Sequence, residues 1–191
     1  MEDAEGMKVI DIQEKNTDAF CRDVVSVTTN YKALLRKPER KINDTIRSYR
    51  VLLCMDVILL VMFGADFIRG ERAALLIVAL AFAILSLVLL LATYPGIMKL
   101  YKTLLADSRP SQLVLDENGV ELRKGDSKSV RLGWDHIAFV RAFKSSVCFL
   151  DSDATGFILA VSMTYKDEIA EYLAENQIQI MRKDVRCLIN N

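Results

Sequence analysis

The sequence predicts an α+β membrane protein. A two-helix transmembrane hairpin is expected between an N-terminal strand/helix segment and a C-terminal antiparallel β-domain closed by one helix. Two long apolar runs, residues 51–68 and 73–94, predict the hairpin. After Leu113 the apolar residues recur at every second position, a period that predicts strands. The predicted divisions of the chain are residues 1–50, 51–98 and 99–191.

The N-terminal segment is expected to contain one strand and one helix. In MKVIDIQ, residues 7–13, Ile10 and Ile12 alternate with polar residues, which is typical of a half-buried strand. A helix is predicted over residues 19–35, although its several β-branched side chains weaken helix formation. Pro38 then interrupts the helical pattern.

A basic stretch precedes the first apolar run. Residues 31–50 contain seven basic and two acidic groups, whereas residues 1–30 contain three basic and seven acidic groups. A helix is predicted from Glu39, with an apolar stripe and with basic side chains outside that stripe. Such a helix beside an apolar span favours an anionic membrane surface. The basic residues expected to face anionic lipid head groups are Arg40, Lys41, Arg47 and Arg50.

The hairpin prediction depends on length and on charge. Residues 51–68 form a helix of about 27 Å and residues 73–94 one of about 33 Å, and each length suffices to cross the hydrocarbon layer. Residues 69–72 make a short polar link, and Pro95-Gly96 is expected to end the second span. Lys and Arg concentrate before the first run and after the second. Both termini are therefore expected in the cytosol, with the protein in the cell membrane through two spans.

Asp56 is the most unusual residue of the hairpin. It is expected about 8 Å inside the hydrocarbon layer, where a carboxylate is unfavourable unless it is paired or hydrated. Ser86 lies at about the same level of the second helix and is a candidate hydrogen-bond partner, within one chain or across a dimer. Proton or ion handling and extension of the side chain to the near interface are the alternatives. Asp66 is expected to pair with Arg69.

The C-terminal region is predicted to hold about six short strands and a helix. LVLDENGVELRK alternates on both sides of Asn118-Gly119, the strongest short signal for a hairpin. A helix is expected to follow Thr164, with Asp167 completing a capping-box-like start. Residues 7–15 are a candidate extra strand for the same sheet. The further strands are predicted at residues 129–132, 137–143, 146–150 and 157–161.

Motifs for catalysis and cofactor binding are absent from the sequence. The four cysteines, predicted to be reduced thiols, include no C-x-x-C pair, and a single histidine, His136, gives no zinc-ligand spacing. Phosphate-binding and nucleophile motifs are missing too, so no enzyme activity, metal or cofactor is expected. A net charge of zero gives no support for nucleic-acid binding. The first thirty residues lack the apolar core of a signal peptide.

Four segments carry a resemblance to a known family. They are MKVIDIQEKNTDAF, LVLDENGVEL, LGWDHIAFVRAF with Trp134, and the final strand and helix at residues 157–176. Their order around two adjacent apolar runs resembles the YcxB-like family of bacterial membrane proteins. The resemblance implies two transmembrane helices followed by a C-terminal pleckstrin-homology-like (PH-like) domain, and it implies no activity. Residues 177–191 extend beyond it, and the proline or basic residue expected before the last helix is missing.

Two classes of function are compatible with these features. The first is a membrane-anchored binding or scaffold protein that presents a PH-like domain to a protein, peptide or lipid head group. Trp134 is then either part of the core or part of a ligand surface, and His136 is expected to be structural. The second class is a component of a small oligomeric transporter or channel that uses Asp56. Regulation of a neighbouring membrane enzyme is a third possibility. The expected partners are the bilayer, a further protein or a second copy of the chain.

Overall fold

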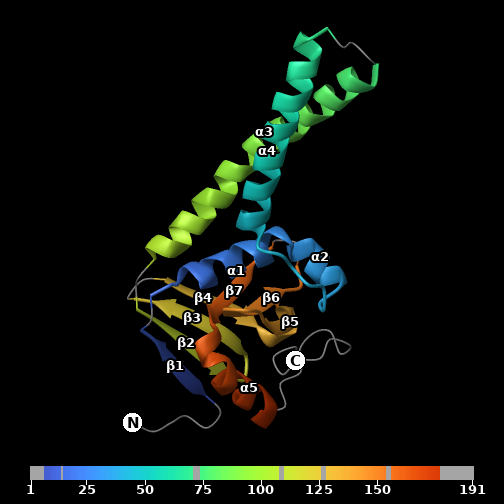
Figure 1. The fold of residues 1–191 in the computed structure, drawn as a ribbon. Helices are drawn as coiled ribbons and strands as arrows, with labels where there is room; N and C mark the ends of the chain where they lie inside the picture. Colours follow the sequence, from blue (N-terminus) through green and yellow to red (C-terminus); the bar gives the residue numbers. More distant parts are fainter. Residues whose placement is uncertain are drawn as a thin grey trace. The chain divides into compact units, whose positions relative to one another are not determined.

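A computed structural model describes residues 7–13, 15–70, 74–107, 110–125, 128–153 and 156–176 (Figure 1). The chain divides into two compact units, called here the β-unit (residues 1–42 and 103–191) and the helical unit (residues 43–102). Along the chain the helices and strands are β1 (Lys8–Ile12), α1 (Asp18–Thr29), α2 (Tyr31–Arg36), α3 (Thr45–Ile68), α4 (Ala74–Ala106), β2 (Ser111–Asp116), β3 (Gly119–Lys124), β4 (Lys128–Gly133), β5 (Ile137–Ala142), β6 (Ser146–Asp151), β7 (Ile158–Ser162) and α5 (Lys166–Glu175). Short 3-10 turns precede β5 and α5.

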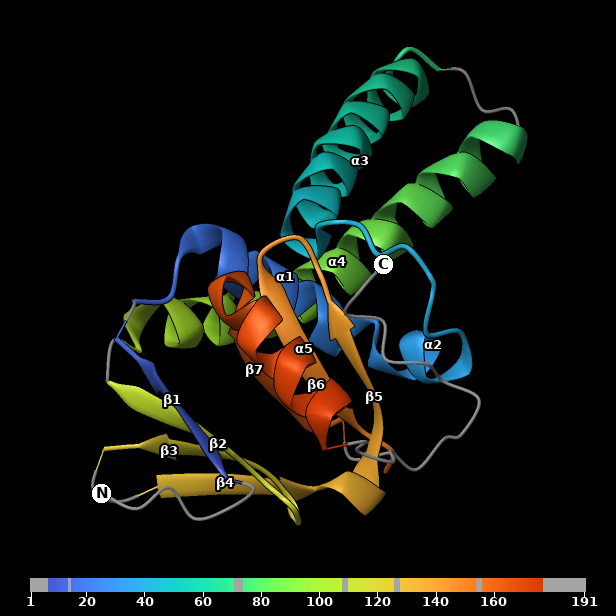
Figure 2. The ribbon, with the colours of Figure 1, turned by 90° about the horizontal axis from the view of Figure 1, so that it is seen from below.

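Two antiparallel sheets make up the β-unit (Figure 2). The first has the strand order β1-β2-β3-β4 and the second the order β5-β6-β7. In the first sheet, β1 pairs with β2 so that Ile10 lies opposite Leu113. The prediction that the N-terminal strand joins the C-terminal sheet is thus confirmed. Strands from before and after the helical hairpin therefore complete one sheet.

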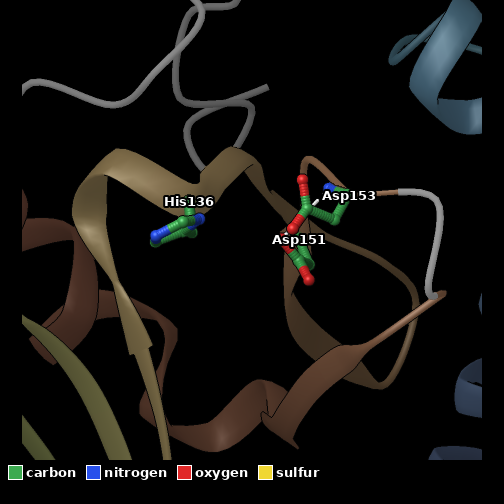
Figure 3. A group of neighbouring side chains, drawn as sticks. All are labelled: His136, Asp151 and Asp153. Atoms are coloured by element: carbon green, nitrogen blue, oxygen red, sulfur yellow. Dashed lines mark hydrogen bonds between the residues drawn. The ribbon is translucent and has the colours of Figure 1, made fainter.

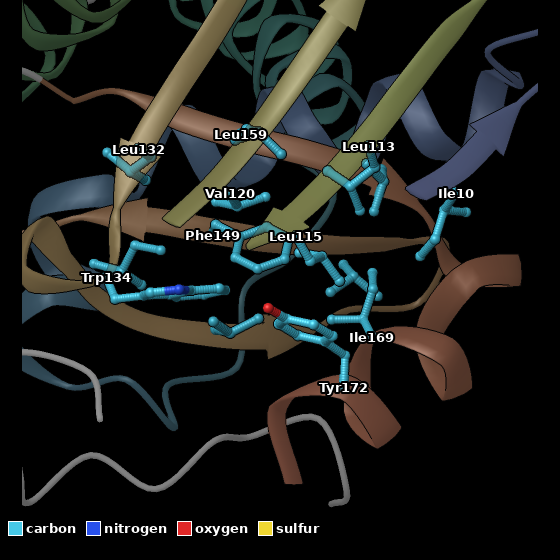
Figure 4. Close-up of a cluster of buried hydrophobic side chains, with 14 residues drawn as sticks. Ile10, Leu113, Leu115, Val120, Leu132, Trp134, Phe149, Leu159, Ile169 and Tyr172 are labelled. Atoms are coloured by element: carbon cyan, nitrogen blue, oxygen red, sulfur yellow. The ribbon is translucent and has the colours of Figure 1, made fainter. Parts of the chain in front are cut away.

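The main core of the β-unit lies between the two sheets and α5 (Figure 4). Inward-facing side chains of both sheets, with Phe149 fully buried, meet Ile169 and Tyr172 of α5. A polar contact holds α5 beside β1, because Lys8 Nζ lies 2.8 Å from Glu171 Oε2. The helix thus covers apolar side chains of both sheets and is bound to the strand at one edge.

A second core lies on the other face of the three-stranded sheet. There, Tyr31 and Leu34 of α2 pack with Phe139, Cys148 and Leu150. The sheet is therefore covered on both faces, and all six residues of β6 are buried. This double cover explains why the β6 sequence SVCFLD is apolar on both faces instead of alternating with charged residues.

Helix boundaries differ from the prediction at both ends of the basic stretch. The helix expected over residues 19–35 is interrupted at Asn30, whose amide bonds to Ser26 O. The helix expected from Glu39 begins only at Thr45, where Asp44 Oδ1 accepts from Arg47 N. Arg40 and Lys41 therefore lie in a non-helical linker, and the prediction of one continuous basic helix is wrong.

A distant arginine explains the non-helical linker. Arg141 Nη1 donates to Pro38 O and, at 2.9 Å, to Arg40 O. Two main-chain carbonyls of the linker are thus satisfied from β5 instead of by a helical ladder. Burial lowers the pKa of Arg141, and its guanidinium also lies 4.8 Å from the centre of the Phe143 ring.

The second long helix passes through the residues expected to end it. α4 includes Pro95 and extends to Ala106. Beyond Pro95 the helix end is bound within the β-unit, because Asn16 Nδ2 donates to Leu104 O at 2.8 Å and to Asp107 O at 3.2 Å. Lys124 also lies 2.8 Å from Asp107. These long-range contacts satisfy carbonyls that a helix end leaves unpaired, and a local sequence signal cannot report them.

Two turns also differ in detail from the prediction. The β2–β3 turn is formed by Glu117 and Asn118, one residue earlier than expected, and Gly119 pairs with Asp116 inside the ladder. A Cβ on Gly119 would lie 2.3 Å from Leu132 O, so close approach of β4 accounts for this glycine. Before α5, Ser162 caps a 3-10 turn, and Tyr165 rather than the predicted Thr164 is the N-cap of α5, which begins at Lys166.

Candidate functional site

The helical unit holds two helices that are long and apolar enough to cross a membrane, by length and composition alone. Their large apolar side chains point outward: Val61 is 67% exposed and Phe82 is 68% exposed. Asp56 differs from these neighbours, because it is only 9% exposed and accepts a hydrogen bond of 2.8 Å from Ser86 Oγ. The structure thus brings together the two polar residues that the sequence singled out, within one chain.

Aromatic stacking provides a second contact between α3 and α4. The rings of Tyr49 and Tyr94 stack with centroids 6.4 Å apart. Nearer the connecting turn, Arg69 Nη1 lies 3.7 Å from Asp66 Oδ1, the pair expected from their spacing. A hydrogen bond and a ring contact therefore join the helices.

The four basic residues expected at a membrane surface do not share one element. Arg40 and Lys41 lie in the linker and Arg47 and Arg50 lie on α3, and all four are exposed. Exposure leaves their charges free to meet anionic head groups.

Trp134 belongs to the core of the β-unit. It is 6% exposed, and its indole Nε1 donates to Asp116 O at 2.8 Å. It lies in the 3-10 turn that connects the two sheets. Because its ring face packs inside and its N–H is satisfied, Trp134 is not available as a stacking platform for a ligand.

A cavity of about 260 Å³ opens in the β-unit. Its walls come from α1, from strands of both sheets and from the last turn of α4, and Lys15 and Lys124 add two basic groups. Sequence reasoning missed this cavity because its walls come from segments far apart in the chain. The apolar residues among its walls include Ile12, Phe20, Val24, Leu104, Leu122, Val130, Phe157 and Leu159.

A cluster of three polar side chains, His136, Asp151 and Asp153, lies outside the cavity lining (Figure 3). His136, Asp151 and Asp153 each offer one ligand atom, and these atoms lie within 4.8 Å of one another. His136 closes the 3-10 turn before β5, and the two aspartates follow from β6 into the next turn. The sequence predicts a structural role for His136. The folded chain brings it next to two carboxylates that carried no recognisable metal-ligand spacing.

The buried thiols are expected to be unreactive. Cys21 and Cys148 are buried and free, and Cys54 is free and exposed on α3. Burial raises the pKa of Cys148 to about 12, which leaves almost no thiolate at neutral pH. Cys187 lies outside the described residues.

Comparison with known proteins found no family model, no curated protein and no solved structure that matches the chain.

Proposed function

We propose that the protein is a membrane-anchored binding protein whose β-unit takes a ligand with an apolar body and an anionic end. The helical unit would be the anchor, with two spans and both termini in the cytosol. The β-unit would be a PH-like domain of the YcxB-like type. Four strands facing three strands, with one helix packed between them, support the PH-like assignment. The excess of Lys and Arg on both flanks of the hairpin supports the orientation.

The cavity carries this proposal. Most of its lining is apolar, so it favours a hydrocarbon group. A chain of about eight methylene groups buried there would contribute about 6 kcal/mol before the cost of association. Leu104 lines the cavity and belongs to the same helix as the second apolar run. The β-unit would therefore be tethered to the bilayer that supplies such ligands.

A basic residue of the cavity lining would favour a ligand with an anionic end group. Lys15 is exposed and lines the cavity, whereas Lys124 is already paired with Asp107 at 2.8 Å. A carboxylate or phosphate that meets Lys15 would orient an acyl chain with its tail among Phe20, Val24 and Leu159. The ligand class that follows is a fatty acid or a single-chain anionic lipid.

Binding of oleic acid by the full chain in lipid nanodiscs tests this assignment. Val130 lines the cavity but is 39% exposed, so Val130→Trp should fill the cavity without disturbing the core. We expect it to weaken oleate binding at least about tenfold, by loss of the apolar site. Val9→Trp is the matched control, since Val9 is 46% exposed on the same sheet and lies outside the cavity lining. Equal binding by wild type and Val130→Trp would rule out this cavity.

The anionic end is tested separately. Lys15→Glu should weaken binding of oleic acid and leave binding of oleyl alcohol unchanged, because only the acid carries a charge. Lys32→Glu, another exposed lysine outside the cavity, is the control. If both ligands respond equally to Lys15→Glu, the lysine does not select an anion.

The proposed orientation of the hairpin in the membrane is tested by a fusion protein. Alkaline phosphatase fused at Gly70, in the α3–α4 connection, should be active in bacteria because this connection is expected outside the cytosol. A fusion that is inactive at Gly70 and active at the C-terminus would overturn the proposed topology.

Transport through an assembly of hairpins is the second candidate, since Asp56 is an acid on an otherwise apolar stretch of α3. Its pairing with Ser86 inside one chain supports a structural role more strongly. Purified protein in liposomes should show no conductance or proton flux if the binding proposal holds. A flux that Asp56→Asn abolishes would favour transport.

A further inference from the structure

The cluster of His136, Asp151 and Asp153 in the β-unit has the composition of a metal site. One imidazole and two carboxylates, from His136, Asp151 and Asp153, place their ligand atoms within 4.8 Å of one another (Figure 3). None of the three residues lines the cavity. The group is therefore separate in space and in chemistry from the proposed ligand site.

The backbone around the group is held in place. Ser152 N donates to His136 O at 2.7 Å, which joins the aspartate turn directly to the turn that carries the histidine. From the other side, the Tyr31 hydroxyl donates to Asp151 O and, at 2.6 Å, to Asp153 O. Two elements thus fix the aspartate turn through its main-chain atoms.

Exposure in the group is uneven in a way that suits a metal ion. Asp151 is 8% exposed, whereas His136 and Asp153 are exposed. Asp153 N donates to Asp151 Oδ1, so one oxygen of Asp151 is oriented by the turn itself. Two carboxylates this close repel each other, and a cation between them would relieve that repulsion. The exposed side leaves room for water to complete the coordination.

A buried hydroxyl provides a further indication. Ser152 Oγ, on the residue between the two aspartates, is buried and has no hydrogen-bond partner among the described residues. Buried polar atoms are normally satisfied by protein, water or an ion. A ligand bound beside this turn would give this hydroxyl a partner.

From this convergence we propose that His136, Asp151 and Asp153 bind one divalent cation of the class that accepts imidazole together with carboxylate, such as Mn²⁺ or Zn²⁺. Mg²⁺ and Ca²⁺ favour all-oxygen ligand sets, so the imidazole selects against them. Asp135 Oδ2 lies 3.6 Å from His136 Nε2, and this third carboxylate would orient the imidazole ring.

Mn²⁺ binding to the untagged full chain in nanodiscs tests the site. Mn²⁺ binds the soft thiolate ligands of cysteine less readily than Zn²⁺ does. The expected result is one bound Mn²⁺ per chain by titration, with nitrogen hyperfine coupling from an imidazole in the pulsed electron paramagnetic resonance spectrum. Mg²⁺ in equal amount should not displace it.

Two exposed positions make the test independent of folding. Asp153→Asn should weaken Mn²⁺ binding at least about tenfold, and His136→Ala should also remove the nitrogen coupling. Asp167→Asn, an exposed aspartate on α5, is the matched control and should bind as wild type. Absence of Mn²⁺ binding, or binding that survives both variants, would overturn the assignment. Oleate binding is measured without metal, so either proposal can fail while the other stands.

Discussion

The two units place the same kinds of side chain on opposite sides of their structure. In the β-unit Phe149 is fully buried, whereas Phe82 in the helical unit is 68% exposed. In the helical unit the acidic residue Asp56 is only 9% exposed between α3 and α4, although large apolar side chains of the same helices are exposed. This difference is expected if the helical unit lies in a bilayer, as proposed, while the β-unit lies in water.

The stabilising contacts differ in the same way. The β-unit is stabilised by apolar surface removed from water, with side chains of both sheets and α5 in one core. In a bilayer the helices would gain little by burying apolar surface, so the Asp56–Ser86 hydrogen bond and the Tyr49–Tyr94 contact would carry more of their association. Loss of apolar volume should therefore be costly in the first unit and inexpensive in the second.

The largest effect is expected for phenylalanine in each unit. Phe149→Ala should lower the free energy of unfolding of the β-unit by about 3–5 kcal/mol, since the ring leaves a cavity in a closed core. Phe82→Ala, in the helical unit, should change this free energy of unfolding by less than about 0.5 kcal/mol. Denaturant titration followed by fluorescence of Trp134, the chain's single tryptophan, reports on the β-unit. Equal effects of the two substitutions would contradict the contrast between the units.

The next largest difference in stability is expected when a glycine of each unit is replaced by alanine. Gly119→Ala should cost about 2–3 kcal/mol, because the new Cβ meets the main-chain oxygen of Leu132 at 2.3 Å. Gly64→Ala on α3 meets nothing within 4 Å and should raise helix stability by up to about 1 kcal/mol. Thermal unfolding followed by circular dichroism separates the two outcomes. Tolerance of Gly119→Ala would mean that β4 can move away.

Removal of a polar side chain is expected to weaken the helical unit, in contrast to removal of an apolar one. Ser86→Ala should weaken α3–α4 association by about 1–2 kcal/mol, because the Asp56 carboxylate is left without its partner. Asp56→Asn keeps a group that can accept from Ser86 and should retain the association. Energy transfer between dyes at the two helix ends, during titration with a denaturing detergent, measures the separation. Loss of association in Asp56→Asn would show that the charge itself is required.

The smallest effect concerns pH. Burial first, and then the nearby charges of Asp151 and Asp153, raise the pKa of Tyr31 to about 12. An unfolded tyrosine loses its proton near pH 10. The contribution of Tyr31 is therefore complete below about pH 10 and falls as the pH rises toward 12, since only the unfolded chain releases the proton.

Tyr31→Phe tests this pH dependence. The substitution removes the hydroxyl's bonds to Asp151 O and Asp153 O and should cost about 1 kcal/mol at neutral pH. It should also reduce the loss of stability between pH 10 and 12. Urea titrations of wild type and variant at pH 9 and pH 11 give both quantities. A loss with pH that is the same in both proteins would exclude Tyr31 as its source.

Strand patterns were predictable because their cause is local. Ile10 and Ile12 alternate with polar residues in a half-buried strand, and the β2–β3 hairpin was located to within one residue. The one-residue error at Gly119 arises because this glycine is required by a neighbouring strand rather than by the turn. The Asp56–Ser86 pair was also predictable, because two helices joined by a short link fix which residues lie at the same level.

The remaining features depend on residues far apart in the chain. The start of α3 follows a linker held by Arg141, and the end of α4 is held by Asn16, each from more than eighty positions away in the sequence. The cavity and the His136 group likewise combine segments that only the folded sheets bring together. No periodicity or spacing along the chain carries such information.

The pairing of β1 with β2 has a consequence for biosynthesis. During translation β1 emerges long before its partner, because both long helices must be made first. If the hairpin spans the bilayer as proposed, β1 and β2 meet only when the chain has crossed twice and both strands are on the same side. A hairpin inserted with one span would leave each strand unpaired in a different compartment. Completion of the four-stranded sheet would then act as a checkpoint for correct membrane insertion, and misinserted chains would expose open strand edges to quality control.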